Sequence, residues 1–336
     1  MSRTTVESFK DLDYPQALNF CSVFYNEVVV TNICTAVRVG KTLDVYLLSW
    51  GRPLLMITTT DVYAVGAPII VGLIFLEVVV SAFKKYEFYK LGDTGGTLGL
   101  LAGNVFVSLI TQGLTLGLYF YLYQFRLVTI NELFAPWIIW LITFLSIDFI
   151  FYWYHRASHR VRFLWAIHMN HHSSTEMNFF VAFRQAWFGP ISKTPFFMVM
   201  PLIGFDPSIT VVAALCSRLW GVVGHTQWIG KLGWLDGIFN TPSTHRVHHG
   251  TNPEYIDSNY GNLLIVWDRL FGTYVKEEAQ VVFGLVNNVE TNNPIKITFY
   301  TWSAIITDVK SAQSFDEVIG YIVGPPDWLP KESKNL

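Results

Sequence analysis

LFAPWIIWLITFLSIDFIFYWYHRASH, residues 133–159, is the most informative stretch of this chain for its architecture. Residues 133–154 are almost entirely apolar and contain a single acid, Asp148. A helix of that length crosses the roughly 30 Å hydrocarbon layer of a membrane. It leads directly into His155 and His159, which are four residues apart and therefore share one helical face. The stretch predicts a membrane-spanning helix whose end presents paired imidazoles.

Two further apolar segments, residues 62–83 and 98–123, are also long enough to span a bilayer. Glu77 lies inside the first of them, and we expect its carboxylate to face protein rather than lipid. Residues 195–223 are apolar but broken at 204–207 by Gly-Phe-Asp-Pro, which leaves pieces too short for two full crossings. A re-entrant hairpin fits that pattern better than two spans do.

Composition supports a membrane protein, because 51% of residues are hydrophobic and only 14% are charged, compared with about 25% charged residues in soluble domains. We therefore predict an all-α integral membrane protein. It should contain three to four transmembrane helices, a re-entrant hairpin and a cytoplasmic helical cap that carries the histidines. The net charge of -2, without any block of basic residues, excludes a general nucleic-acid binder.

Three regions follow from this pattern. Residues 1–60 mix apolar and charged residues and are expected to form an interfacial or membrane-associated segment. Residues 61–275 are expected to form a membrane-embedded functional domain, and residues 276–336 a polar C-terminal tail. Lysines between the first two spans and arginines after the third place the histidine-bearing end on the cytoplasmic side, by the positive-inside rule.

All nine histidines fall between positions 155 and 249, in three boxes with helical spacing plus one single residue. Residues three or four apart lie on one face of a helix, so each box can direct two or three imidazoles at a common point. On spacing alone the single histidine is equally well a buried, hydrogen-bonded core residue. The boxes are His155 and His159; His168, His171 and His172; and His245, His248 and His249, and the single residue is His225.

Nine imidazoles are too many for one ion but suit two ions with four or five ligands each. Imidazole binds zinc, copper, iron and nickel, and a structural zinc needs only four ligands. Iron is favoured because an apolar membrane host suggests a hydrocarbon substrate, and oxidising unactivated C–H bonds requires redox chemistry that zinc does not provide. The sequence therefore predicts a pair of iron ions.

Two polar residues near the boxes are candidates for supporting catalysis. Asp148 lies seven residues before His155 and shares its helical face, so its carboxylate could orient the second nitrogen of a ligand. The alternative for Asp148 is a hydrogen bond between helices. Asn178 is a further candidate of the same kind.

The three boxes resemble the fatty acid hydroxylase and sterol desaturase superfamily. The resemblance rests on HRASH (155–159), HMNHH (168–172) and HRVHH (245–249), with support from NTPSTHRVHHG (240–250) and WDRLFGT (267–273). It runs from about residue 70 to 330 and is strongest to the alkylglycerol monooxygenase-like branch. One departure is Gln227, which stands where His-Thr-Glu is usual.

That resemblance implies a membrane di-iron enzyme that uses O2 and two external electrons to oxidise a lipid. The eight box histidines would be the iron ligands, and His225 the ninth. In this branch, hydroxylation beside an ether oxygen yields a hemiacetal that breaks into an aldehyde and a glycerol derivative. The reductant would be tetrahydrobiopterin, or else a cytochrome b5-type or ferredoxin-type donor, and the location would be the endoplasmic reticulum in a eukaryote.

Two rival functions remain open from the sequence. A sterol or fatty acyl hydroxylase or desaturase could use the same metal centre, and its product would distinguish it. A non-enzymatic transporter or sensor could use the histidines as a metal relay and would consume no O2. The histidines lie at helix ends, whereas a transporter places its site near the middle of the membrane.

Overall fold

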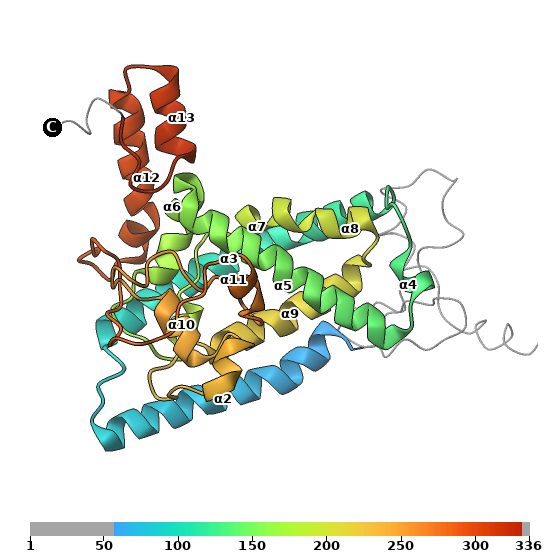
Figure 1. Cartoon of the computed structure of the whole chain (residues 1–336), viewed down its shortest axis with the longest axis horizontal. Helices are drawn as coiled ribbons and strands as arrows, with labels where there is room; N and C mark the ends of the chain where they lie inside the picture. The colour runs from blue at the N-terminus through green and yellow to red at the C-terminus, as the bar shows by residue number, and fades with distance from the viewer. Residues whose placement is uncertain (1–56, 331–336) are drawn as a thin grey trace, which may run out of the picture. The chain divides into compact units, whose positions relative to one another are not determined.

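The computed structural model describes residues 57–330, so the expected N-terminal segment of residues 1–60 lies almost wholly outside the described residues. Within the described residues the regular structure is helical (Figure 1). The β pairing described there consists of two isolated bridges, between Phe239 and Leu264 and between Gly250 and Phe283. The prediction of an all-α protein is confirmed for this part of the chain.

Three described helices are long and apolar enough to cross a membrane: α2 (Thr59–Lys84), α3 (Leu91–Tyr123) and α5 (Pro136–Arg160). They contain the first two predicted segments entirely and most of the third. Helix α5 begins with Pro136 in its first turn, where the missing backbone N–H has no helical partner to lose. It then continues without a break through His155 and His159, so the first histidine box belongs to a spanning helix.

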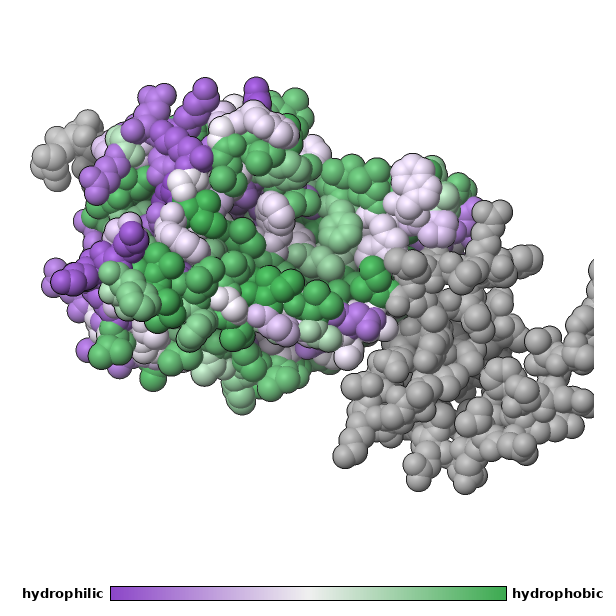
Figure 2. Space-filling view, turned by 90° about the horizontal axis from the view of Figure 1, so that it is seen from below, coloured by the Kyte–Doolittle hydropathy of each residue, from purple (hydrophilic) through white to green (hydrophobic). Residues whose placement is uncertain are grey.

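The spanning helices leave large apolar side chains uncovered by protein. Examples are Ile69 and Phe75 on α2 and Phe106 and Leu109 on α3, all of which are exposed. Figure 2 shows hydrophobic side chains over much of one face, with hydrophilic side chains gathered toward the left-hand end of the view. Contiguous apolar surface of this kind is typical of protein that contacts lipid.

The predicted hairpin is formed by α7 (Gly189–Phe197), α8 (Val199–Ile203) and α9 (Pro207–Val223). The chain turns at Gly204, whose φ is +125° and where a Cβ atom would lie 1.9 Å from the Val128 carbonyl oxygen. Glycine is required there because any side chain would clash with that backbone. Asp206 then caps α9 by accepting hydrogen bonds from the backbone N–H groups of Ser208 and Ile209. The break falls at residues 204–206, as the sequence predicted.

Shorter helices complete the described chain. Residues 294–323 form a helical pair that packs against the helix carrying the second histidine box, and Arg162 of that helix forms an ion pair with Asp308. The boundary expected at residue 275 stays a prediction. These shorter elements are α4 (Ile130–Leu133), α6 (Arg162–His172), η2 (Val181–Phe183), η3 (Gly233–Gly237), α10 (Pro242–His248), α11 (Val266–Leu270), α12 (Pro294–Ser311) and α13 (Phe315–Val323).

Candidate metal centre

The nine histidines come together in two separate groups. Within each group, one ring nitrogen from every histidine lies within 4.8 Å of those of the others. The rings therefore converge although their positions span almost a hundred residues of sequence. The first group contains His155, His159, His168, His172 and His248, and the second contains His171, His225, His245 and His249.

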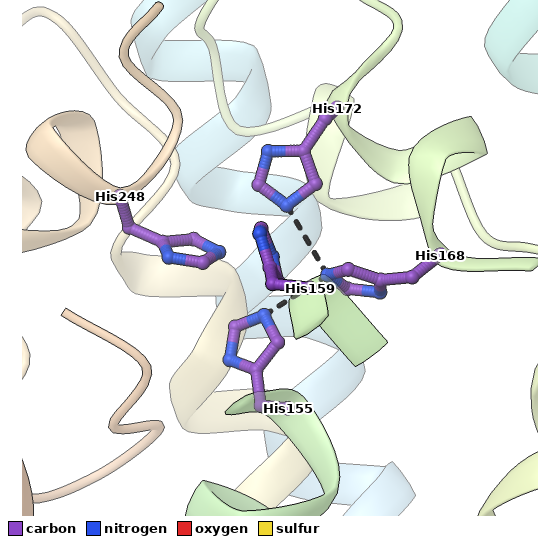
Figure 3. Close-up of side chains that lie close together, drawn as sticks. All are labelled: His155, His159, His168, His172 and His248. Atoms are coloured by element: carbon purple, nitrogen blue, oxygen red, sulfur yellow. Dashed lines mark hydrogen bonds between the residues drawn. The ribbon is translucent and has the colours of Figure 1, made fainter. Parts of the chain in front are cut away.

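Short connections between helices bring the boxes together. Only Val161, in an extended conformation, separates α5 from α6, so the chain reverses abruptly and the second box faces the first. Helix α10 carries the third box and begins with a capping box, in which Thr241 and Thr244 bind each other's backbone N–H groups. Figure 3 shows the five rings of the first group pointing inward from α5, α6 and α10.

The distances between ring nitrogens match those expected around a shared ion. In the first group, the Nε2 atom of His168 lies 2.9 Å from that of His155 and 3.1 Å from that of His172. In the second group, the Nε2 atom of His225 lies 3.1 Å from that of His171 and 3.0 Å from that of His245. Two imidazole nitrogens held about 2.1 Å from one ion at right angles would lie about 3 Å apart.

Three further histidine ring nitrogens are buried without a hydrogen-bond partner among the described residues. They are the Nε2 atoms of His159, His248 and His249. A buried polar atom left unpaired costs free energy, so such atoms are uncommon unless a ligand or ion pairs with them. The donor set of both groups therefore fits metal ions, and imidazole-only donors favour a transition metal over calcium or magnesium.

Backbone carbonyls hold the second nitrogens of two histidines in the first group. The Nδ1–H of His155 donates to the carbonyl of Tyr260 at 2.7 Å, and the Nδ1–H of His248 donates to the carbonyl of Ser258 at 2.9 Å. These bonds fix the tautomer and leave the Nε2 lone pair free for a metal.

The second group is held in the same way. The Nδ1–H of His225 donates to the Gly221 carbonyl at 2.8 Å, and that of His171 donates to the Arg184 carbonyl at 3.3 Å. The Arg184 carbonyl precedes α7 and the Gly221 carbonyl lies in the last turn of α9, so the hairpin begins and ends beside the histidines. A re-entrant segment enters and leaves the membrane on the same side, so both of its ends must lie close together, as they do here.

The loop that supplies the Ser258 and Tyr260 carbonyls has an unusual backbone. Asp257 and Asn259 have φ values of +60° and +55°, a left-handed conformation that Asp and Asn tolerate better than most residues. Asn259 is fully buried, accepts a hydrogen bond from the Val275 N–H and donates to the Thr244 carbonyl. Its side chain thus fixes this loop against α10.

Asp268 stabilises the chain at the end of this loop. Asp268 accepts hydrogen bonds from the backbone N–H groups of Tyr260 and Gly261, and burial raises its pKa to about 6. The sequence did not single out Asp268 or Asn259. The sequence after the last box does contain several Asp and Asn residues, but such residues are common in turns of every kind and did not identify these two as structural supports of the metal centre.

The expected contact between Asp148 and a ligand ring is not what the structure shows. The Asp148 carboxylate accepts hydrogen bonds from the backbone N–H groups of Leu263 and Leu264 and from the indole N–H of Trp267. A shared helical face was a correct inference, but seven residues along a helix is about 10 Å, too far for a short side chain to reach His155. Asp148 instead joins α5 to the segment after Tyr260.

Asn178 also lies outside both histidine groups. Its side-chain amide donates to the Phe88 carbonyl at 2.6 Å, and its oxygen accepts from the backbone N–H groups of Phe180 and Val181. It therefore ties the segment after the second box to the connection between α2 and α3.

Glu77, in the first spanning helix, faces protein as the sequence predicted and is fully buried. Its carboxylate accepts hydrogen bonds from the Tyr89 hydroxyl at 2.6 Å, from the Phe179 N–H at 2.8 Å and from the Thr226 hydroxyl. Because Thr226 follows His225, this intramembrane acid contacts the segment that carries a ring of the second group. The sequence indicated its burial but not this partner.

The surroundings keep the histidines outside the spanning helices neutral. Burial lowers the pKa of His225 and of His248 to about 4. Burial, followed by repulsion from neighbouring imidazoles, holds the pKa of His245 and His249 well below its usual range. Neutral imidazole is the form that binds metal, so the site is electrostatically suited to cations at neutral pH.

Comparison with known proteins adds an independent finding. Residues 140–273 match the family model for fatty acid hydroxylases. The chain is 36% identical over 262 residues to the alkylglycerol monooxygenase of Xenopus tropicalis, which covers 77% of this chain and 57% of that protein. It is 35% identical over 267 residues to that of Homo sapiens, covering 79% and 59%, and 32% identical over 269 residues to that of Danio rerio, with the same shares.

The chain thus spans less than two thirds of the length of these relatives. No solved structure matches it significantly. The matched region contains all three histidine boxes.

Proposed function

We propose that this chain, whose residues 140–273 match the family model for fatty acid hydroxylases, is an O2-dependent di-iron monooxygenase that hydroxylates an alkyl chain of a lipid. The observation that carries the proposal is the division of nine histidines into groups of five and four, each converging on its own point. Two iron ions held there would supply O2 activation and the oxidation of an unreactive C–H bond. Zinc is redox-inert and would not supply this chemistry.

The substrate we propose is an ether lipid. The relatives above are named alkylglycerol monooxygenases, and the exposed apolar surface of the spanning helices suits an enzyme whose substrate is drawn from the bilayer. Hydroxylation of the carbon beside the ether oxygen gives a hemiacetal, which breaks into an aldehyde and a glycerol derivative. A sterol or fatty acyl hydroxylase or desaturase with the same centre is the alternative, and it would yield an alcohol or an alkene.

The reaction needs two electrons and two protons for each O2, since one oxygen atom enters the lipid and the other leaves as water. All nine histidines lie in the two groups, so none is left in this sequence to bind a haem. Electrons would therefore come from a separate donor, either tetrahydrobiopterin or a cytochrome b5-type or ferredoxin-type protein.

The chain's own residues would hold and orient the centre. The nine imidazoles would bind the ions, and the Ser258 and Tyr260 carbonyls would fix two of the rings. Asp148 and Asn178 would act as positioning residues, because their hydrogen bonds go to structural segments and not to either histidine group. The basic residues near the histidine end favour a cytoplasmic location for the centre, which in a eukaryote means the cytoplasmic face of the endoplasmic reticulum.

The test is metal analysis and lipid product identification on the wild type and on His171→Ala. Removing one of four converging ligands should lower metal content and abolish O2-dependent oxidation of a labelled alkylglycerol. Lys310→Met, which changes a residue on α12 away from both groups, is the control and should behave as the wild type. Full metal content or full activity in His171→Ala would contradict the proposal.

A further inference from the structure

Helix α12 (Pro294–Ser311) carries two separate apolar faces. The first is buried against the rest of the protein and includes Ile297 and Ile305. The second lies on another side of the helix, because its members follow one another at intervals of four, three and four residues. Its large side chains are exposed or half-buried, so the protein leaves this second face partly uncovered. The second face consists of Ile295, Phe299, Trp302 and Ile306.

A polar stripe runs along α12 beside this uncovered face. Its members, Lys296, Ser303 and Lys310, recur every seven residues and are all exposed. A helix with bulky apolar residues on one side and lysines on its polar side is typical of helices that lie in a membrane surface.

Helix α13 (Phe315–Val323) repeats the arrangement. Phe315, Ile319 and Val323 follow one another at intervals of four residues and are exposed. Tyr321, on another side of α13, is buried, and its ring centre lies 5.8 Å from the guanidinium carbon of Arg162 on α6. Helix α13 is thus fixed to α6 through one side and exposes apolar side chains on another.

The uncovered face of α12 continues onto the surface of a spanning helix. The ring centre of Phe299 lies 6.3 Å from that of Trp187 and 6.2 Å from that of Phe188, just before α7. The Trp187 indole in turn packs against Gly103 of α3, where even a Cβ atom would clash with it. Beyond Gly103, α3 exposes Phe106 and other large apolar side chains. Aromatic rings therefore join the apolar face of α12 to surface that is expected to contact lipid.

This junction lies where α3 is expected to enter the hydrocarbon layer. Helix α3 has 33 residues and is therefore about 50 Å long, roughly 20 Å longer than the hydrocarbon layer is thick. Its last residue is Tyr123, and tyrosine is enriched at membrane–water interfaces. Counting about 20 residues back from Tyr123, the length of one crossing, reaches Gly103 and the Trp187 that packs on it. Tryptophan is also typical of that boundary.

The direction of the two helices agrees with this position. In Figure 1, α12 and α13 run across the direction of the spanning helix α5, beside α6. A helix in the plane of a membrane has to cross the spanning helices in this way.

We propose that α12 and α13 lie in the plane of the membrane surface and insert their exposed apolar faces among lipid at the level of the headgroups. The occupant is lipid rather than a second copy of the chain, because the face of α12 is continuous with the lipid-facing surface of α3. The exposed charges of the two helices have both signs, Lys296 and Lys310 against Asp316, so the attraction is apolar and uncharged lipid suffices.

The position of these helices bears on the metal centre through α6. The side-chain amide of Asn170, which lies between His168 and His171, donates to the Thr298 hydroxyl of α12 at 3.4 Å. A pair of helices anchored in the membrane surface would thus hold the second histidine box at a fixed height relative to the lipid. This inference goes beyond the proposed function and does not depend on the reaction, so its test needs no activity.

The test places a fluorescent label at single cysteines in the full-length protein, in nanodiscs of uncharged lipid. Cys21, Cys34 and Cys216 are first replaced by serine. Labels at Phe299→Cys and Ile306→Cys should be quenched strongly by nitroxide-bearing lipids and several-fold less by iodide in the water. Labels at the matched exposed positions Lys296→Cys and Lys310→Cys should show the opposite order. Leu109→Cys on α3 gives the signal of a position in contact with lipid.

Metal content equal to that of the unlabelled protein shows that a variant is folded, and if Phe299→Cys does not fold, the exposed Ile306→Cys gives the result. Quenching by iodide at Phe299 and Ile306 as strong as at Lys296 and Lys310 would overturn the proposal, because the face would then lie in water. Shielding of Phe299 and Ile306 from both quenchers would also overturn it, since protein, such as a second copy of the chain, would then cover the face.

Discussion

The Glu77 carboxylate, in the first spanning helix, accepts a hydrogen bond from the hydroxyl of Thr226, the residue that follows His225. The same carboxylate accepts hydrogen bonds from Tyr89 and from the backbone of Phe179. A helix remote in sequence from the histidine boxes is therefore joined to the four-histidine group. The three hydrogen bonds also offset the cost of burying an acid inside the membrane region.

Replacing Glu77 should weaken metal binding by the four-histidine group specifically. In Glu77→Ala the Thr226 and Phe179 donors lose their acceptor, and the His225 segment loses its tether, so we expect metal affinity to fall about 10- to 100-fold, as is usual for residues that orient ligands. Metal titration followed by optical spectroscopy would measure this. Glu132→Ala, an exposed acid on α4, should leave the titration unchanged. An unaltered titration of Glu77→Ala would show that the tether does not position His225.

Ligands from the two groups should control different ions. His168→Ala removes a ligand of the five-histidine group, and His225→Ala removes one of the four-histidine group. We expect each variant to lose mainly one of the two ions, with the four-histidine group more sensitive because it has fewer ligands to spare. Metal-to-protein ratios from elemental analysis, with spectra of the remaining ion, would check this. Identical remaining spectra in both variants would contradict two separate sites.

Asn259 should matter for both stability and metal binding. Asn259→Leu places a branched side chain at positive φ and removes the hydrogen bonds to Val275 and Thr244, so we expect a loss of about 1–3 kcal/mol in the free energy of unfolding. Asn259→Gly keeps the backbone conformation and should lose less. Thermal unfolding of the metal-free and metal-loaded protein measures both effects. If the glycine variant were the less stable one, backbone strain would not be the cause.

The metal-free protein should lose stability as pH falls below neutrality. The pKa of His225 and of His248 is about 4 in the folded chain, compared with about 6.5 in an unfolded chain. Between those values the unfolded chain binds protons that the folded chain does not, so the free energy of unfolding decreases as pH falls from about 6.5 to 4. We expect the Tm of the metal-free protein to be level from pH 7 to 8 and to fall from pH 7 to 5.

His225→Asn is the matched variant for that pH dependence. It removes one of the groups that must stay neutral, so its Tm should fall less steeply with acidification than that of the wild type. A Tm that is constant between pH 7 and 5 in the wild type would contradict buried neutral histidines.

Much of the architecture was predictable because it depends on local patterns. Long apolar runs predicted α2, α3 and α5, and the Gly-Phe-Asp-Pro sequence located the break in the hairpin. Helical spacing predicted that each box would direct its rings at a common point, and this was wrong for the second and third boxes, each of which divides its rings between the two groups. The partners of Asp148 were not predictable, because a helical face gives direction but not the identity of the chain that packs against it.

The sequence alone determined that this is a membrane-embedded helical protein with nine clustered imidazoles. The length of an apolar segment and the spacing of residues on a helix both depend only on residues that are near one another in the sequence. The division of the imidazoles into groups of five and four was decided only by the tertiary structure. His171 and His172 are adjacent in sequence yet belong to different groups, because consecutive side chains on a helix point about 100° apart and meet different partners. Which partners they meet depends on α9 and α10, which reach the site from distant parts of the sequence.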